Sequence, residues 1–478
     1  MQNKKPNVLL IMSDSLSPHY MGAYGDVTGA TPNLDNLARS GVTFDRAYCN
    51  SPLCAPSRAS MVTGRYVSEL GAYDNGNLFS TEIPTFNHVF KRAGYETVLI
   101  GKMHFIGYDQ YHGFDKRLAM ETDYSQGYNP KSYRIAYDWN QLSGGNPMGG
   151  GWMGESYVND KKWDNYTHHY DRDVAIHKEA VRFLSEKSEK KDSPFFCCVS
   201  YHHPHNPFYI PENMKEKFKN IDLPLPQIPP DMAERYGVME KWLNDFHYVT
   251  GRSGEIMDGE NLRWLYETYL GMTADMDARA GELLEIMKSN GLDQNTIVIF
   301  TSDHGDMLGY RGMIQKRCLY ERSIRVPLIF SYPGRYPAGT RINSPASLLD
   351  LLPTFADMVS ERAPDNLPGS SVMNAVQNSA EAPDKVIFCE YHGEGVHAPC
   401  FAGIKGNYKY IYVHGHEELF YDLKNDPEEL DNRINDHKYS GIKDVIKAAL
   451  LKQFDPELIA AQARQSQENR KYIFEAYK

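Results

Sequence analysis

A cysteine and an arginine stand four positions apart in the segment Cys54-Ala-Pro-Ser-Arg58, which continues to Thr63 and Gly64. Pro56 follows Cys54 by two residues and fixes the backbone where a helix would begin. A helix N-terminus binds anions through its free backbone N–H groups. Arg58 lies one helical turn after Cys54, on the same face. The segment predicts a cysteine-derived group and a guanidinium at a positive helix end; a buried cysteine beside a surface arginine is the alternative.

Acidic residues follow two short apolar runs that are rich in β-branched side chains. Asp14 comes after residues 7–12, and Asp303 and His304 come soon after residues 295–300. Such runs are typical of buried parallel strands, and ligand sites lie at the carboxyl ends of these strands. Carboxylates with one imidazole suit calcium, magnesium or manganese, so a divalent metal site is predicted. For Asp14 alone, a helix cap is the alternative.

Basic and titratable side chains follow two further apolar runs. Lys102 and His104 stand two apart after residues 96–100, so on an extended segment they would point to one face. One supplies a fixed charge and the other a titratable nitrogen. Three histidines crowd the segment Tyr201-His-His-Pro-His205, after residues 194–200. A structural role is the alternative for each of these histidines.

The elements that would carry these residues alternate along the chain. Strands are predicted over residues 7–12, 96–100, 194–200, 295–300 and 325–331. Helices are predicted over residues 31–39, 84–92, 171–188, 261–289 and 347–359. This alternation predicts an α/β fold with a large, mostly parallel sheet sandwiched between helices.

The remaining segments predict loops and a smaller C-terminal unit. Residues 142–152 are rich in glycine and aromatics and residues 223–232 in proline, so both are predicted as surface loops, and residues 361–384 as a linker. Beyond the linker, strands over 385–391, 400–405, 408–414 and 419–423 would form a small antiparallel sheet, followed by a helix over 456–476. We therefore expect a catalytic domain over residues 1–365 and an α+β subdomain over residues 366–478.

Length, charge and cysteine usage limit the functional classes. The 478 residues carry 51 Lys and Arg against 62 Asp and Glu, a net charge of -11, and 41% are hydrophobic. A large core is expected, and neither nucleic acid nor a membrane is expected as a partner. Seven cysteines are too few, and odd in number, for a disulfide framework. No signal-peptide core is evident, so we expect a cytoplasmic protein, or an exported one if a signal has been trimmed.

The motifs together resemble the sulfatase family, and most closely choline sulfatases. The family signature C-x-P-S-R followed by T-G is matched by Cys54, Pro56, Ser57, Arg58, Thr63 and Gly64, and G-K-x-H is matched by residues 101–104. The resemblance runs from residue 7 to about residue 432. It implies an alkaline-phosphatase-like fold and a sulfuric ester hydrolase. It also implies that a formylglycine-generating maturation enzyme oxidises Cys54 to formylglycine.

The resemblance implies a role for each site residue. The metal, expected to be calcium with magnesium or manganese as alternatives, would be held by Asp14, Cys54, Asp303 and His304. The catalytic residues would be Cys54, Arg58, Lys102, His104, His205 and Lys316. Ser15 departs from the family pattern of Asp or Gln at its position, so water would complete the metal shell. Asn75 matches a further polar site position. Glu394 would supply a carboxylate near the mouth, and Trp152 or Trp163 an aromatic wall; for each of these three, an ordinary surface or packing role is the favoured alternative.

In the implied reaction, one hydroxyl of hydrated formylglycine attacks sulfur while His205 protonates the departing alcohol. His104 then removes the proton of the second hydroxyl as sulfate leaves. Arg58, Lys102 and Lys316 hold the negative charge. An acidic exterior around a cationic pocket favours a small-molecule sulfate ester or an exposed terminal sulfate.

Two other functions fit the same residues. A phosphonate monoester or phosphodiester hydrolase would use the same formylglycine chemistry on phosphorus. A metal-binding scaffold without activity is a third reading. A homo-oligomer is compatible with the sequence, and its contacts would involve the insert at 142–152 or the C-terminal helix.

Overall fold

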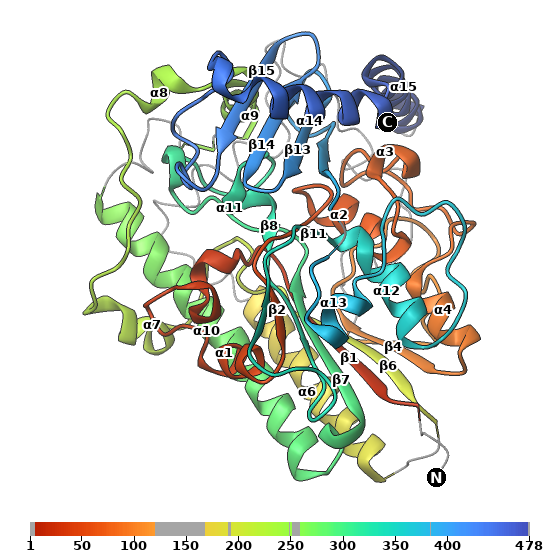
Figure 1. Cartoon of the computed structure of the whole chain (residues 1–478). Helices are drawn as coiled ribbons and strands as arrows, with labels where there is room; N and C mark the ends of the chain where they lie inside the picture. Colours follow the sequence, from red (N-terminus) through yellow and green to blue (C-terminus); the bar gives the residue numbers. More distant parts are fainter. Residues whose placement is uncertain are drawn as a thin grey trace.

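The computed structural model describes residues 5–119, 168–189, 193–247, 249–250, 259–382 and 384–476. Its centre is an eight-stranded sheet in the order β10-β2-β9-β7-β1-β6-β4-β5 (Figure 1). In chain order these strands are β1 (Asn7–Ser13), β2 (Val42–Phe44), β4 (Glu96–Gly101), β5 (Lys116–Leu118), β6 (Phe195–Ser200), β7 (Thr296–Ser302), β9 (Leu328–Ser331) and β10 (Thr340–Ile342). β9 runs antiparallel to β7 and β2, and the other neighbouring strands are parallel. The predicted, mostly parallel sheet is thus confirmed.

Helices cover both faces of this sheet, as the side chains of β1 illustrate. Val8, Leu10 and Met12 belong to one core, which includes α2 (Cys54–Thr63), α4 (Phe86–Arg92) and α12 (Leu351–Met358). Leu9 and Ile11 belong to a second core, which includes α1 (Pro32–Arg39), α6 (His168–Glu189), α7 (Glu212–Lys219) and α10 (Gly259–Ser289). Alternate strand residues point to opposite faces, so a strand buried on both sides is apolar throughout.

Two predicted segments differ from the structure. Residues 325–331 form two strands in two sheets, because Pro327 has no N–H to donate to a continuous ladder. β8 (Arg325–Val326) joins a three-stranded sheet with β3 (Ala47–Tyr48) and β11 (Ala346–Ser347), and β9 continues in the large sheet. The predicted linker at 361–384 contains the helix α13 (Met373–Asn378), whose Met373 and Val376 pack into the core of the α4 face.

The C-terminal region forms the predicted antiparallel sheet, in the order β12-β13-β14-β15. Its strands are β12 (Ile387–Tyr391), β13 (Cys400–Lys405), β14 (Tyr408–Val413) and β15 (Glu417–Asp422). α14 (Ser440–Gln453) packs on this sheet and α15 (Pro456–Ala476) follows it, both in the blue upper part of Figure 1. The boundary placed at residue 365 stays a prediction.

Short helices fill the connections: α3 (Val67–Leu70), α8 (Met232–Arg235), α9 (Val238–His247) and α11 (Glu321–Ile324). The proline-rich stretch 223–232 has no helix or strand before Met232, as predicted. The predicted loop 142–152, with Trp152, and Trp163 lie outside the described residues. All seven cysteines are buried and free. In the part of the chain that the structure describes, every helix is too short or too polar to span a membrane.

Candidate active site

Two acidic residues meet at the carboxyl ends of β1 and β7. These strands are parallel neighbours, and Ser13 of β1 stands opposite Ser302 of β7. The next residues, Asp14 and Asp303, therefore leave the sheet side by side. Both are fully buried. The sheet register itself thus brings two carboxylates together, as the strand-end pattern predicts.

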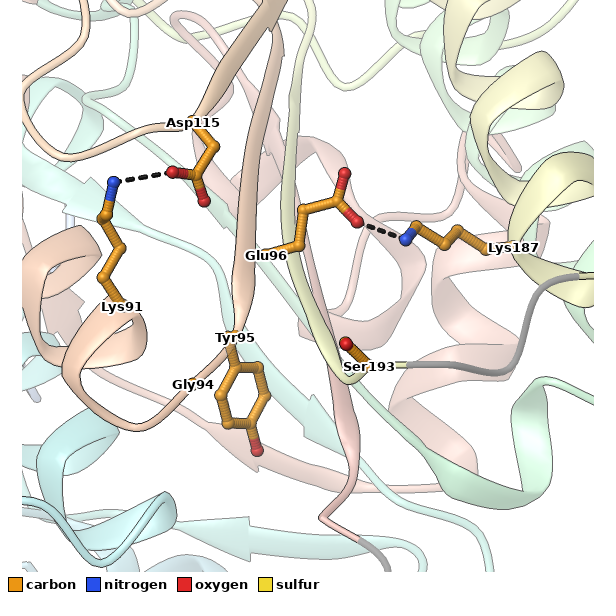
Figure 2. Close-up of a pocket in the computed structure, with 7 residues that line it drawn as sticks. All are labelled: Lys91, Gly94, Tyr95, Glu96, Asp115, Lys187 and Ser193. Carbon is orange, nitrogen blue, oxygen red and sulfur yellow. Dashed lines mark hydrogen bonds and ion pairs between the residues drawn. The ribbon is translucent and has the colours of Figure 1, made fainter.

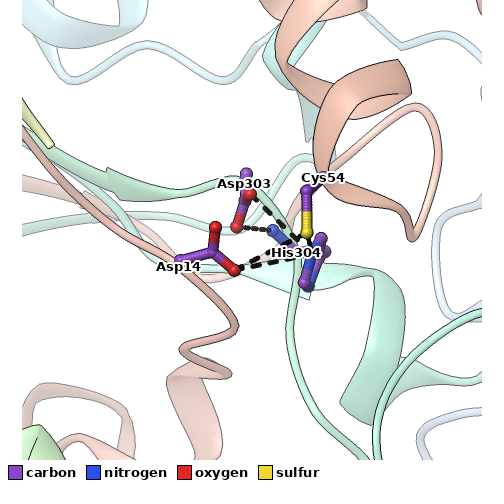
Figure 3. Close-up of side chains that lie close together, drawn as sticks. All are labelled: Asp14, Cys54, Asp303 and His304. Atoms are coloured by element: carbon purple, nitrogen blue, oxygen red, sulfur yellow. Dashed lines mark hydrogen bonds and ion pairs between the residues drawn. The ribbon is translucent and has the colours of Figure 1, made fainter. Parts of the chain in front are cut away.

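Cys54 and His304 complete a compact group with these carboxylates. Cys54 is the first residue of α2, and its Sγ lies 3.2 Å from His304 Nε2 and 3.8 Å from Asp14 Oδ1. One potential ligand atom from each of Asp14, Cys54, Asp303 and His304 lies within 4.8 Å of the other three. Figure 3 shows the four side chains converging on one point. All four predicted metal ligands are therefore in one place.

Arg58 ties this group to the surrounding strands. Its Nε donates to Asp303 Oδ2 at 2.8 Å and its Nη2 to Asp14 Oδ2 at 2.9 Å. The remaining Nη1 donates to the carbonyl of Lys102 at 2.8 Å and to Ser200 Oγ at 2.9 Å. The guanidinium has no exposed surface, so its fixed fork sets where both carboxylates lie.

Two lysines add positive charge around Cys54, and a histidine, His205, contacts one of them. Lys102 Nζ pairs with Asp14 Oδ2 at 2.6 Å. His205 Nε2 lies 3.6 Å from Cys54 Sγ and 2.5 Å from Lys316 Nζ. Lys102 and Lys316 are buried, so the group holds three buried cations against two carboxylates when Arg58 is included. This arrangement suits an anionic ligand.

The segment around Lys316 is held in an unusual backbone conformation. Gln315 has a φ of 68° and Arg317 a φ of 82°, a left-handed region that costs about 1–2 kcal/mol per residue outside glycine. Asp306 Oδ1 accepts the backbone N–H of Gln315 at 3.0 Å, which helps to hold the turn. Lys316 therefore reaches His205 from a braced segment rather than from a free loop.

His104 is the residue whose predicted geometry is wrong. The sequence predicts an extended segment from Lys102 to His104, but the φ of His104 is 58°. Left-handed backbone breaks the two-residue alternation, so the spacing does not place the two side chains on one face. His104 is buried two residues beyond Lys102. Its proposed role as a base stays a prediction.

Asn75 and Glu394 lie together beside the start of α2. Asn75 Oδ1 accepts the backbone N–H of Ala55, the residue after Cys54, at 3.0 Å. The backbone N–H of Asn75 donates to Glu394 Oε1 at 3.1 Å. Arg317 pairs with the other Glu394 oxygen at 3.3 Å. The carboxylate is buried and engaged by this chain's own groups, so it supports the loop that carries Asn75.

Protonation states in the group follow from burial and neighbouring charge. Burial, and then Asp14, raises the pKa of the Cys54 thiol to about 11, against the opposing effect of Lys316 and Lys102. Burial alone would raise the pKa of Asp14, but Lys102, His205 and Arg58 hold it well below its usual range. Cys54 is therefore a neutral thiol beside an ionised carboxylate.

The two histidines are neutral for related reasons. Burial lowers the pKa of His304, and Lys316 adds to that effect, while Asp303 opposes it. Burial and then Lys316 hold the pKa of His205 well below its usual range. A neutral imidazole is the form that binds a metal, which fits the position of His304 in the group.

Sequence reasoning missed two supporting residues. Ser200, at the end of β6, accepts a hydrogen bond from Arg58, and a polar residue ending an apolar run was its signal. Asp173 of α6 accepts the backbone N–H groups of His202 at 2.7 Å and His203 at 2.9 Å, and so holds the turn that leads to His205. An aspartate inside a helix gives no such signal in the sequence.

Ser15 occupies the position where the motif departs from the family pattern. Its backbone N–H donates to Asp303 Oδ1 at 3.2 Å and its Oγ donates to Asp14 Oδ1 at 3.2 Å. Its φ is 67°, so this residue also adopts left-handed backbone. Ser15 thus contacts both carboxylates directly and orients them.

A cavity at the opposite end of the sheet has a different character. It has a volume of about 530 Å³ and lies near the amino end of β4 (Figure 2). Its charged lining groups are paired with each other: Lys91 with Asp115 at 2.6 Å, and Glu96 with Lys187. These pairs leave it without the excess positive charge found around Cys54.

Family models match nearly the whole chain. The model described as "Sulfatase" matches residues 6–360. A second, described as "N-sulphoglucosamine sulphohydrolase, C-terminal", matches residues 309–455.

Characterised relatives cover the chain from end to end. A choline-sulfatase of Rhizobium meliloti (strain 1021) is 31% identical, over 100% of this chain and 92% of the relative. An N-acetylglucosamine-6-O-sulfatase of Bacteroides thetaiotaomicron is 26% identical, over 92% of this chain and 84% of the relative.

Solved structures share the fold. The protein BT4656, in complex with its substrate D-glucosamine-2-N,6-O-disulfate, is 24% identical with a TM-score of 0.73, covering 97% of this chain and 99% of that one. A phosphonate monoester hydrolase of Agrobacterium radiobacter is 24% identical with a TM-score of 0.74, covering 96% of each chain.

Proposed function

The chain belongs to the sulfatase family, and on that premise we propose that it cleaves a sulfate monoester to an alcohol and sulfate with a formylglycine made from Cys54. As a family member it is a sulfuric ester hydrolase. The position of Cys54 is the observation that supports the formylglycine mechanism most directly. It stands at the N-terminus of α2, inside a buried group of two carboxylates and an imidazole, with three buried cations beside it.

The unmodified thiol is a poor candidate for the nucleophile. A cysteine nucleophile works as a thiolate, and activated examples have pKa values well below 8.5. Burial and Asp14 raise the pKa of Cys54 to about 11 instead. A formylglycine at this position, made by a formylglycine-generating enzyme, supplies a hydrated aldehyde with one hydroxyl to attack sulfur and a second whose deprotonation releases sulfate. The environment of Cys54 supports this role.

The donor set fits a divalent metal. Asp14 and Asp303 offer carboxylate oxygens and His304 a neutral imidazole, all buried and converging. A bound divalent ion supplies positive charge that lowers the pKa of a hydroxyl and polarises the sulfate. Oxygen-rich ligand sets favour calcium, magnesium or manganese, and we propose calcium.

The three cations would hold the sulfate group and its developing charge. Lys102 and Lys316 come from separate segments and lie beside Asp14 and His205. Arg58 fixes the positions of the two carboxylates. Preorganised positive charge in a site closed to water is often the largest contribution to catalysis. His205 Nε2, 3.6 Å from Cys54 Sγ and in contact with Lys316, is placed to pass a proton to the departing alcohol oxygen; because the imidazole is neutral, that proton comes from the Lys316 ammonium. We propose that His104 is the base that removes the proton of the second hydroxyl when sulfate is released.

The substrate is proposed to be a small sulfate ester or an exposed terminal sulfate. The characterised relatives act on such groups: choline sulfate by the name of one and a 6-O-sulfate of N-acetylglucosamine by the name of another. Asn75 and Glu394 stand beside the start of α2, where the alcohol part would lie. A phosphonate monoester remains the second candidate, because a phosphonate monoester hydrolase shares the fold over 96% of this chain.

Two measurements test this proposal. Mass spectrometry of the peptide that contains Cys54, from protein made together with a maturation enzyme, should show the aldehyde in place of the thiol. Turnover of an aryl sulfate should exceed turnover of the matching aryl phosphonate monoester. An unmodified Cys54 in active protein would contradict the mechanism, and a large preference for the phosphonate would favour the second candidate.

A further inference from the structure

The C-terminal helix α15 reaches the loop that carries Asn75. Arg470 of α15 donates from Nη1 to Asp74 Oδ1 at 2.9 Å and from Nη2 to Asp74 Oδ2 at 2.6 Å. Both side chains are buried. A bidentate Arg–carboxylate pair fixes direction as well as distance, so Asp74 has one position relative to the helix.

Two more hydrogen bonds connect the same helix and loop. Asn77 Nδ2 donates to Ser466 Oγ at 2.8 Å, and Tyr73 Oη donates to Gln462 Oε1 at 3.3 Å. Gln462, Ser466 and Arg470 follow one another at intervals of four residues on α15 and so share one side of the helix. The contacts bracket Asn75 on both sides.

Hydrogen bonds within the loop constrain it further between these contacts with α15. Asp74 Oδ1 accepts the backbone N–H of Gly76 at 2.8 Å, and Asn77 Oδ1 accepts the backbone N–H of Asp74 at 3.1 Å. On its other side the loop packs against Gly393, where an added Cβ would stand 2.9 Å from Asp74 Cβ. Asn75 therefore has little freedom once Asp74 is held.

Asn75 passes this restraint to the residue beside the nucleophile. Its Oδ1 accepts the N–H of Ala55, one of the first-turn groups of α2 that have no partner within the helix. Its own N–H donates to Glu394. A chain of direct contacts thus runs from Arg470 through Asp74 and Asn75 to the start of α2.

We propose that Arg470 is a positioning residue for the active site: through Asp74 it sets the loop at residues 71–78, so that Asn75 fixes the first turn of α2 next to Cys54 and holds Glu394. Helix α15 thereby supports a site whose other residues come from the ends of β1 and β7, from α2 and from loops. The loop contacts stand on the structure alone, and their effect on turnover rests on the proposed function.

A double-mutant cycle tests the connection. Arg470→Ala and Asn75→Ala should each lower kcat/KM by about 10- to 100-fold, because a misplacement of about 1 Å far from the reacting atoms has effects of that size. If Arg470 acts through Asn75, the double variant should be no worse than Asn75→Ala alone. Multiplied effects would overturn the proposal. Arg470→Lys, which keeps the charge but not the paired bonds, should recover part of the loss.

Controls separate this role from a loss of folding. Arg362→Ala removes a bidentate pair with Asp365 that is largely exposed, and should leave kcat/KM unchanged. If Arg470→Ala does not accumulate as folded protein, Arg470→Lys and Ser466→Ala take its place in the cycle. The melting temperature of each variant shows whether activity falls in protein that is still folded.

Hydrogen exchange gives a readout that needs no substrate. Backbone amides of residues 71–78 and of Ala55 should exchange faster in the Arg470 variant than in the wild type, while β1 and β7 keep their protection. Unchanged exchange in the loop would overturn the proposal even if turnover falls. If the wild type hydrolyses no sulfate ester, the proposed function fails, yet the exchange result still decides whether Arg470 positions the loop.

Discussion

At the amino end of β4, Glu96 pairs with Lys116 and Lys187 near solvent, whereas just past its carboxyl end Lys102 pairs with Asp14 in the interior. At the first end, side chains such as Lys91 and Lys116 are about half exposed. Exposed pairs of this kind contribute about 0–1 kcal/mol to stability. At the second end, Asp14, Arg58 and Asp303 have no exposed surface.

The difference shows where charge has a chemical purpose. Burying an ion costs several kcal/mol, and attraction to a partner recovers this only with good geometry. At the carboxyl end three buried cations face two carboxylates. Ion pairing therefore does not fully offset the free-energy cost of burying these charges. An anion or an anionic transition state bound there would supply the missing negative charge. The cavity of Figure 2 has two cations paired with two carboxylates among its lining residues and lacks that excess of positive charge.

Among variants near the two ends of β4, Cys54→Ala should have the largest effect on turnover. We expect kcat for an aryl sulfate to fall at least about 10⁴-fold, because the group that carries the nucleophile is removed. Cys400→Ala, which removes a buried free thiol from β13, is the matched control and should keep full turnover. Activity in the Cys54 variant after purification to homogeneity would refute the mechanism.

The next largest effect concerns the metal. Asp303→Asn keeps the shape of the side chain but removes its charge, so metal affinity should fall at least about 100-fold, since even residues outside the coordination shell have effects of 10–100-fold. Metal content after dialysis measures it. Asp115→Asn, at the amino end, should leave the metal content unchanged. Equal metal content in both variants would place the metal elsewhere.

Arg58→Lys should lower turnover less than Cys54→Ala does. The lysine keeps a positive charge but cannot bond Asp14, Asp303 and Ser200 at once. We expect kcat to fall by about 10²–10³-fold, as for other lost charge-stabilising groups. Kinetics on protein whose melting temperature has been measured would show this. A variant with wild-type kcat would mean that charge alone matters and geometry does not.

Lys91→Ala should produce the smallest effect of the series. It breaks the exposed pair with Asp115, so the free energy of unfolding should change by no more than about 1 kcal/mol. Turnover should be unchanged. Denaturant unfolding and a steady-state assay measure both quantities, and a clear loss of turnover would show that the amino end of β4 also contributes to the reaction.

The strand-end residues could be predicted because the physics behind them is local. The segment 295–300, which is rich in apolar residues and is soon followed by Asp303 and His304, predicts both the strand and the place where its polar residues emerge. The same holds for Asp14 after β1. Cys54 at the start of α2 could be predicted from Pro56 and the helix face shared with Arg58. These inferences needed no knowledge of distant contacts.

The supporting contacts could not be predicted because they join residues far apart in the chain. Asp74 and Arg470 are 396 positions apart, and nothing near either residue indicates the other. The left-handed backbone of His104 and Arg317 is imposed by tertiary packing, against the local preference of both residues. Pro327, by contrast, is a local signal for the break in the predicted strand at 325–331, because it has no N–H to donate to a ladder.

The burial of Cys54 also sets an order of events. The residue is 3% exposed, and Asp14, His205 and Lys316, which surround it, come from three separate segments of the chain. An enzyme that oxidises this side chain must hold it, with its flanking backbone, in a pocket of its own. If Cys54 is oxidised as proposed, the oxidation competes in time with folding: a chain that closes first keeps its thiol out of reach. The fraction of active molecules in a preparation is then set by two rates, and no later treatment of the folded protein should raise it.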